Sequence, residues 1–487
     1  MRRAVLGVVG AVLLIGAAPA RADVGSTDLT ALLAQCSGAM NPNGANGQPV
    51  SSLSYRFCDD GTPSVGGTTP NTTGANAIRV PAAYRYPDPV PAGVADRTVD
   101  GLPPKDPNGA ARVQGTDPVT QTIALDVDIT LPTLPAPPGG YPLVVLMHGC
   151  CSGSRTSWES GTKSTPGSID AGGERWHYNN VWFASRGYVV LNYTSRGFVD
   201  GNNHGSTGES QLDSLQYEIN DYQYLVGLMV DNPALNINPQ KVVPTGGSYG
   251  AGFTWLAFTD PIWQSPGGKS AKLAAAAPTY GWTDLVYSLI PTGRHFFDFG
   301  SPPSLDGSDS GFGPGAVVGI PIRSIIAALF LSGQTGVPST STPLPPHATF
   351  PSSVQQAFNC TQTIYPPEQN PLCGALLGTV MPDFFKYRSA YYRNDFFARL
   401  AADPAYRTPV YSAGTHTDPL FPPIEHHRMA QRLRAAVPGY PIEEYFGDYN
   451  HFVQNKAKEW GDICTGGGSR HVCSATDYPG GDFNAHP

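Results

Sequence analysis

The chain has 487 residues, which is too long for one domain of average size and too short for three, and its 40% hydrophobic content suffices for a sizeable core. Charged residues make up only 14% and the formal net charge is −8, so no basic excess supports a nucleic-acid partner and no polybasic patch favours a membrane surface. The 56 glycines and 48 prolines indicate a loop-rich chain, but they stay below the share typical of a disordered one.

Residues 1–22 have the pattern of a secretory signal peptide. Two arginines precede an apolar run over 4–18, and small residues flank a cleavage site near Ala22. The run is shorter than the roughly 20 residues of a membrane span, so we favour a cleaved signal over an uncleaved N-terminal anchor. We therefore predict a secreted protein, periplasmic or extracellular, with no membrane span after the signal is removed.

Residues 23–118 are rich in Gly, Pro, Asn, Asp and Thr and have few periodic apolar stretches. We expect a loop-rich N-terminal extension that wraps the main domain.

Eight cysteines in an exported chain predict a disulfide framework. We favour the pairs nearest in sequence, which would place two bridges outside the central sheet, in the extension and the C-terminal tail, and one in an inserted segment. For two adjacent cysteines we favour structural disulfides, to each other or to distant partners, over a functional thiol. No Cys/His set has zinc-finger spacing, so no structural metal is predicted. The favoured pairs are Cys36–Cys58, Cys360–Cys373 and Cys464–Cys473, and the adjacent cysteines are Cys150 and Cys151.

From residue 119 onward, strand patterns alternate with helix patterns. Residues 123–131 alternate apolar and polar side chains, as a half-buried strand does, whereas 141–147 is a continuous apolar run typical of a strand covered on both faces. This alternation predicts a mostly parallel sheet flanked by helices. Further strands are predicted at 187–193, 241–245, 273–278, 409–413 and 442–446, and helices at 212–230, 251–258 and 424–436.

Residues 285–395 interrupt this order of elements. They hold an apolar run over 317–331, a stretch rich in Ser, Thr and Pro, and an aromatic-rich helix predicted at 384–400. We interpret this insertion as a cap over the active site, with a peripheral packing subdomain as the alternative. The core is then assigned to 119–284 and 396–460, and 461–487 is a C-terminal tail.

The segment Gly246-Gly-Ser-Tyr-Gly250 matches G-x-S-x-G between a predicted strand and a predicted helix. That setting is typical of a nucleophile elbow, in which a tight turn presents the serine at the start of a helix. A Gly-rich turn with an incidental serine is the alternative. We predict that Ser248 is a nucleophile.

A serine hydroxyl needs a base, and the base needs an acid that orients it. His451 follows the last predicted strand, and Asp418 follows the strand before it, so both belong to loops at the carboxyl ends of strands. Asp448 is the rival acid. The order Ser248, Asp418, His451 is the order of α/β-hydrolase triads.

A fourth motif, His148-Gly149-Cys150, comes directly after a buried strand. An oxyanion hole needs two donors, and the expected ones are the backbone N–H groups of Tyr249 and Cys150. His148 is predicted to orient this loop rather than to act as a base.

Over roughly 120–290 and 395–455 the chain resembles the CocE/NonD acyl hydrolases, relatives of the Xaa-Pro dipeptidyl-peptidase (S15) group. The resemblance implies an α/β-hydrolase fold, a triad of Ser248, Asp418 and His451, and a helical cap formed by the insertion. Members usually end in a β-sandwich domain, whereas 36 residues follow His451 here, so we favour esterase-like activity over dipeptidyl-peptidase activity. The motifs that carry the resemblance are His148-Gly149, Ser154-Arg-Thr-Ser-Trp158-Glu159, Ala184-Ser-Arg-Gly-Tyr188, Tyr193-Thr-Ser-Arg-Gly197, Glu218-Ile-Asn-Asp221 and Gly246-Gly-Ser-Tyr-Gly250.

The sequence thus predicts a secreted serine hydrolase that cleaves an ester or amide bond of a small or polymeric substrate through an acyl-enzyme, with no cofactor and no metal. An acyltransferase with the same triad and an Xaa-Pro-type peptidase are the enzymatic alternatives. A non-catalytic binding protein of the same fold is the third, which the complete triad disfavours. The sequence predicts no oligomeric state.

Overall fold

The computed structural model describes residues 24–37, 55–58, 65–66, 69–70, 77–80, 123–150, 153–159, 178–200, 205–206, 208–290, 322–333, 350, 352–362, 387–447 and 451. The predicted signal peptide and the predicted tail at 461–487 lie outside these residues.

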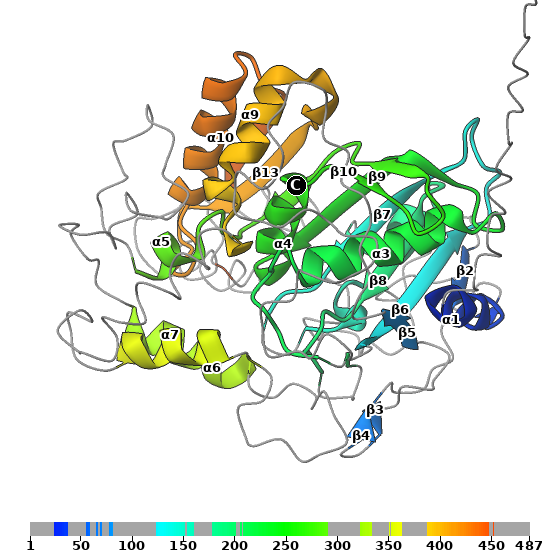
Figure 1. The fold of residues 1–487 in the computed structure, drawn as a ribbon, viewed down its shortest axis with the longest axis horizontal. Helices are drawn as coiled ribbons and strands as arrows, with labels where there is room; N and C mark the ends of the chain where they lie inside the picture. The colour runs from blue at the N-terminus through cyan, green and yellow to red at the C-terminus, as the bar shows by residue number, and fades with distance from the viewer. Residues whose placement is uncertain are drawn as a thin grey trace, which may run out of the picture.

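A ten-stranded sheet has the order β1-β2-β6-β8-β7-β9-β12-β13-β14, and β5 also pairs with β6 (Figure 1). The strands from β8 to β14 in this order are all parallel, whereas β6 is antiparallel to β8, and β2 and β5 are antiparallel to β6. The predicted mostly parallel sheet is therefore confirmed. The strands are β1 Cys36–Ser37, β2 Tyr55–Cys58, β5 Ala77–Val80, β6 Ile123–Pro132, β7 Tyr141–Met147, β8 Val189–Tyr193, β9 Ile237–Gly247, β12 Ala277–Thr279, β13 Val410–Thr415 and β14 Ile442–Gly447.

Two small hairpins lie outside this sheet, β3 with β4 and β10 with β11. They comprise β3 Val65–Gly66, β4 Thr69–Pro70, β10 Ile262–Gln264 and β11 Ser270–Lys272. The α-helices are α1 Val24–Leu33, α2 Asn180–Ala184, α3 Glu218–Asp231, α4 Tyr249–Phe258, α5 Leu285–Leu289, α6 Arg323–Gly333, α7 Ser352–Gln362, α9 Asn394–Ala402 and α10 Ile424–Ala436, and the 3-10 turns are η3 Arg155–Trp158, η8 Ala390–Tyr392 and η9 Pro404–Tyr406.

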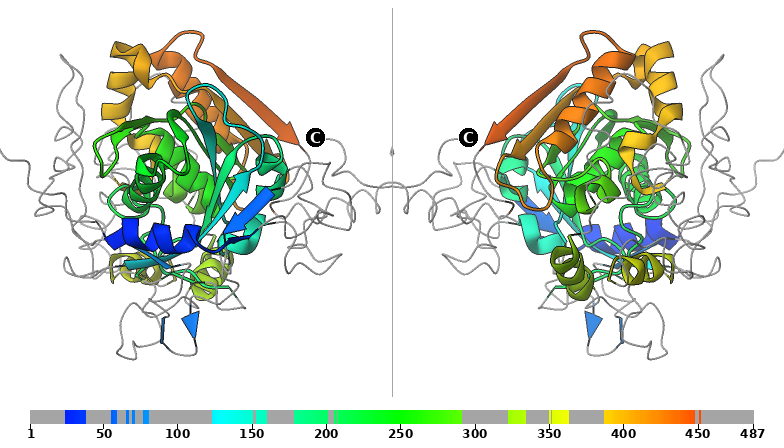
Figure 2. Two further views of the ribbon diagram at one scale, coloured as in Figure 1. Left: turned by 90° about the vertical axis from the view of Figure 1, so that its right-hand side faces the viewer. Right: turned by 90° about the vertical axis from the view of Figure 1, so that its left-hand side faces the viewer.

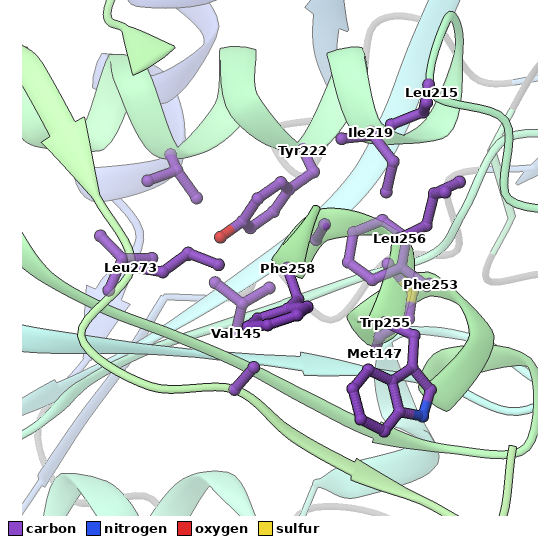
Figure 3. Packing of buried hydrophobic residues seen from close by; sticks show 14 of the residues in the cluster. Val145, Met147, Leu215, Ile219, Tyr222, Phe253, Trp255, Leu256, Phe258 and Leu273 are labelled. Atoms are coloured by element: carbon purple, nitrogen blue, oxygen red, sulfur yellow. The ribbon is translucent and has the colours of Figure 1, made fainter. Parts of the chain in front are cut away.

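The central strand β7 is covered on both faces, as its apolar run predicts. Leu143, Val145 and Met147 belong to the main core with side chains of α3, α4, α9 and α10. Val144 and Leu146, which alternate with them, belong to a second core under α2 and η3. Figure 3 shows Val145 and Met147 facing the aromatic side chains of α4, and Figure 2 shows the strands twisting from β2 to β14. The helices thus lie on both faces of the sheet.

The prediction that 123–131 is a half-buried strand is wrong, because β6 is buried on both faces. Its polar residues Asp126 and Asp128 are fully buried, and both contact the buried guanidinium of Arg155 from η3; the Nε–Oδ2 distance to Asp126 is 2.9 Å. The alternating carboxylates therefore face a buried cation rather than water.

The described parts of the N-terminal extension add strands to the central sheet. Strands β2 and β5 both pair with β6, and α1 is tied to β5 by an ion pair between Asp28 and Arg79 at 2.7 Å. The predicted Cys36–Cys58 disulfide is confirmed, with a Cα–Cα distance of 3.9 Å. Its expected place outside the central sheet is wrong, because the two cysteines lie in β1 and β2, where they are also register partners.

Helix boundaries differ from the sequence prediction at two places. The helix predicted at 212–230 begins only at Glu218, because Leu212 and Asp213 have φ of 57° and 62°, which a helix does not allow. The described part of the helix predicted at 384–400 is broken into η8 and α9. The apolar run over 317–331 carries no helix prediction, and α6 begins within it at Arg323.

Helices α6 and α7 of the insertion pack together and lie apart from the strands in Figure 1. Helix α5 lies beside α10 instead, with the guanidinium of Arg428 3.9 Å from the ring centroid of Tyr287. The backbone N–H of Ile322, just before α6, donates to the carbonyl of Leu289 at the end of α5 (3.0 Å). Phe330 of α6 stacks on Phe358 of α7, with 3.8 Å between ring centroids. Within the described part of the chain, no helix combines the length and the apolar character needed to cross a membrane.

Candidate active site

The turn between β9 and α4 holds Ser248 in a strained conformation. Its φ of 57° and ψ of −118° lie outside the regions that L residues usually adopt. A Cβ on Gly246 or Gly250 would overlap the carbonyl oxygen of Met147, at the end of β7. Only glycine therefore lets this turn pack against β7. With the parallel sheet and its flanking helices, this strand–turn–helix element gives the α/β-hydrolase fold that the sequence predicts.

The structure brings the three predicted catalytic residues together from distant parts of the chain. His451 Nε2 lies 2.9 Å from Ser248 Oγ, and His451 Nδ1 lies 2.8 Å from Asp418 Oδ2. All three side chains are buried. The distances fit a serine that donates to Nε2 and an Nδ1–H that donates to the carboxylate.

Asp418 is held by its own loop. Its Oδ1 accepts hydrogen bonds from the backbone N–H groups of Leu420 (2.7 Å) and Phe421 (3.0 Å), which leaves Oδ2 for His451. The rival acid Asp448 lies outside the described residues. The geometry therefore assigns the position beside the histidine to Asp418.

Two aromatic rings contact the imidazole of His451. Tyr280 and Phe421 approach it with centroid distances of 5.5 and 5.3 Å and steep interplanar angles. Sequence reasoning missed both rings. Phe421 lies three residues after Asp418, but no pattern marks Tyr280, which follows β12 with an unusual φ of 40°. These rings restrict the orientation of the imidazole.

The loop after β7 is fixed by His148, which is fully buried. Its Nε2 accepts a hydrogen bond from the backbone N–H of Ser195 (2.9 Å), and its Nδ1 therefore donates to the carbonyl of Gly149 (2.7 Å). Burial lowers the pKa of His148 to about 4, so the ring is neutral. It has the orienting position that the sequence predicts.

This loop lies directly against the elbow. A Cβ on Gly149 would be 3.7 Å from both the Gly247 carbonyl oxygen and the Ser248 Cβ. The predicted oxyanion donors Cys150 and Tyr249 contribute to the same apolar cluster. The amide of Tyr249 is also one of the first helical N–H groups of α4, which lack carbonyl partners within the helix.

Of the cysteines other than Cys36 and Cys58, the structure describes Cys150 and Cys360. Cys150 and Cys360 each form a disulfide with a partner outside the described residues, so the alternative of a functional Cys150 thiol is wrong. The other cysteines, Cys151, Cys373, Cys464 and Cys473, lie outside the described residues, and their pairing stays a prediction. In the part of the chain that the structure describes, no group of three or more His, Cys, Asp or Glu side chains is arranged to hold a metal ion.

No family model matches the chain, and neither does any curated protein. Among solved structures, acetyl xylan esterase 1 of Thermoanaerobacterium sp. JW/SL YS485 shares 11% identity at a TM-score of 0.34, over 68% of this chain and 74% of the esterase. The rice cell wall degrading esterase LipA of Xanthomonas oryzae shares 14% sequence identity at a TM-score of 0.34, and the match covers 68% of this chain and 79% of LipA. The acylaminoacyl peptidase of Pyrococcus horikoshii shares 12% sequence identity at a TM-score of 0.33. That match covers 69% of this chain but only 36% of the peptidase.

Proposed function

We propose that the protein is a secreted serine hydrolase that cleaves ester bonds through an acyl-enzyme. The observation that supports this most strongly is the hydrogen-bonded series Ser248, His451, Asp418 at a strained elbow. The hydrogen-bond distances between the three side chains are 2.8 and 2.9 Å, and the serine has a positive φ. This arrangement fits nucleophilic catalysis far better than it fits a structural role.

In the first half-reaction, Ser248 Oγ attacks the ester carbonyl carbon while its proton passes to His451 Nε2. Asp418 stabilises the resulting imidazolium through Nδ1–H. The amides of Tyr249 and Cys150 bind the oxyanion of the tetrahedral intermediate. The intermediate then collapses, the C–O bond to the leaving alcohol breaks, and the alcohol takes the proton from Nε2.

In the second half-reaction, a water molecule gives a proton to His451 Nε2 and attacks the acyl carbonyl. The second intermediate releases the carboxylic acid and returns the proton to Ser248 Oγ. No step needs a cofactor or a metal ion, because the histidine moves each proton and the amides hold each negative charge.

We infer an apolar acyl or alkoxy group as the substrate class, because buried apolar side chains pack against the proposed nucleophile and base. A cluster of apolar side chains includes Tyr249, next to the nucleophile, and Phe421, which touches His451. It extends to α5 and, through Ile325, to α6 of the insertion, which we interpret as a cap. The buried members of this cluster are Phe198, Tyr249, Trp282, Leu285, Leu420 and Phe421. Within the hydrolases, the sequence motifs from His148-Gly149 to Gly246-Gly-Ser-Tyr-Gly250 favour the CocE/NonD acyl hydrolases.

A panel of p-nitrophenyl esters of increasing acyl length, with Xaa-Pro amides beside it, tests this proposal on the mature protein. We expect ester turnover that rises from acetate to longer acyl chains, and Ser248→Ala should lose at least about 10³-fold in kcat. Turnover confined to the amides would contradict the ester assignment. Ester turnover that survives in Ser248→Ala would contradict the serine mechanism.

A further inference from the structure

Tyr249 connects the elbow to a buried turn through its side chain. Its hydroxyl accepts a hydrogen bond from the backbone N–H of Asp213 (3.2 Å) and lies 3.3 Å from Ser210 Oγ and 3.5 Å from Glu218 Oε1. The side chain is fully buried. One residue therefore carries both the proposed oxyanion amide and a phenol that is fixed inside the protein.

The turn that receives this phenol is itself built with strain. Leu212 and Asp213 both have left-handed backbone angles without being glycine. Glu218 closes the turn, because its two carboxylate oxygens accept hydrogen bonds from the N–H groups of Gln211 (2.6 Å) and Ser214 (2.8 Å). Such a turn fixes the position of the Asp213 amide, and hence that of the phenol.

The Asp213 side chain has no counterion among the described residues, and the Tyr249 hydroxyl is the polar group that faces it. It is fully buried, and neither carboxylate oxygen has a hydrogen-bond partner among the described residues. Burial, reinforced by the nearby charge of Glu218, raises its pKa well above the usual range, while the Tyr249 hydroxyl opposes this rise. Burial likewise raises the pKa of Glu218 to about 7. An uncharged Asp213 is therefore the form that this turn accommodates.

The other charged or titratable groups around the turn do not neutralise Asp213. Arg196 is engaged in a bidentate pair with Asp221 at 2.8 Å, and Arg388 donates to the backbone carbonyl of Gln211 at 2.5 Å. Tyr193, whose pKa is raised chiefly by burial, faces the same acids from β8. The proton on Asp213 is thus the remaining way to remove its charge.

We propose that Tyr249 is a positioning residue whose hydroxyl anchors the oxyanion amide to the turn over 210–218, and that this turn keeps its shape while Asp213 is uncharged. The proposal rests on the proposed function, since an oxyanion amide matters only for a serine that is acylated. Its consequence is that the oxyanion hole depends on a side-chain contact made by residues outside the proposed triad.

Tyr249→Phe tests the anchor, with Tyr222→Phe as the matched control. Tyr222 is also a fully buried tyrosine, but its hydroxyl has no hydrogen-bond partner in the described part of the chain. An oxyanion amide acts mainly in the transition state, so Tyr249→Phe should lower kcat about tenfold while KM stays within about twofold, and Tyr222→Phe should change neither. Wild-type kcat in Tyr249→Phe, with Ser248→Ala inactive, would overturn the anchor and leave the proposed function intact.

Asp213→Asn tests the uncharged form, because the amide keeps the shape of a protonated carboxyl and cannot ionise. An acid whose pKa is raised in the folded state stabilises the protein at a pH below the pKa of about 4 that it has in the unfolded chain. This stability is lost as the pH rises through the pKa of the folded state. The wild-type protein should therefore lose stability relative to Asp213→Asn as the pH rises. The measurement is the denaturant midpoint of both proteins at about pH 4.5 and about pH 8, in a Ser248→Ala background so that it does not depend on activity. Equal pH dependence in the two proteins would overturn an uncharged Asp213.

Discussion

Replacing Asp418 with Asn probes how the proposed triad sets the tautomer of the His451 imidazole. The two backbone N–H groups of Leu420 and Phe421 point at one oxygen of Asp418, and His451 faces the other. An asparagine keeps only one oxygen, and the two backbone donors hold that oxygen on their side. Its NH₂ group must then face His451 Nδ1, which can only accept.

The consequence falls on the other ring nitrogen. With Nδ1 accepting, the neutral imidazole carries its proton on Nε2, which faces Ser248 Oγ at 2.9 Å and can no longer take the serine proton. The expected loss in kcat at neutral pH is about 10⁴-fold, or about 5.5 kcal/mol of transition-state stabilisation.

Steady-state hydrolysis of a p-nitrophenyl ester measures this loss. The matched control is Asp403→Asn, because Asp403 also accepts a backbone N–H with one oxygen, that of Ala405 at 2.8 Å, but begins the remote turn η9. The control should keep wild-type kcat, since an asparagine caps as well as an aspartate. An Asp418→Asn variant within tenfold of wild type would refute the argument from the two backbone donors.

Two further predictions concern stability. Replacing Cys36 and Cys58 with alanine removes a bridge between positions 22 residues apart, so unfolding in guanidinium should show a loss of about 3 kcal/mol with kcat unchanged. Arg155→Met leaves the two aspartates of β6 buried without their cation, so it should lower the free energy of unfolding by about 3–5 kcal/mol. A loss below about 1 kcal/mol would contradict a stabilising network of Arg155 with these aspartates.

The convergence of Ser248, Asp418 and His451 could be predicted because their signal is local. Ser248 lies in a motif between a strand and a helix, and Asp418 and His451 each follow a strand, so the carboxyl ends of parallel strands bring them together. The pairing of Cys36 with Cys58 followed from short separation in the same way. That they lie in β1 and β2, at one end of the sheet, could not be seen in a segment with so little periodicity.

Other features depend on contacts that no sequence pattern records. The alternation of apolar and polar residues in β6 indicated that one face of the strand meets water. The sequence pattern could not show the buried partner of these polar residues, because Arg155 lies 27 positions from Asp128 and in another element. The phenol of Tyr249 reaches a turn 36 positions earlier in the chain. The ring of Tyr280 meets His451 only because the loops after β12 and β14 converge. Loops fix such contacts through tertiary packing, and local propensity carries no information about them.

The most direct test of the central claim is reaction of the mature protein with a fluorophosphonate, followed by mass spectrometry of the digested product. Phosphonylation needs a serine that an adjacent base has activated, so it reports the Ser248–His451 pair without knowledge of the substrate. We expect one adduct per chain on Ser248, with none in Ser248→Ala and much slower labelling in His451→Ala. An unlabelled wild-type protein, or an adduct on another serine that persists in Ser248→Ala, would contradict a serine hydrolase built on this triad.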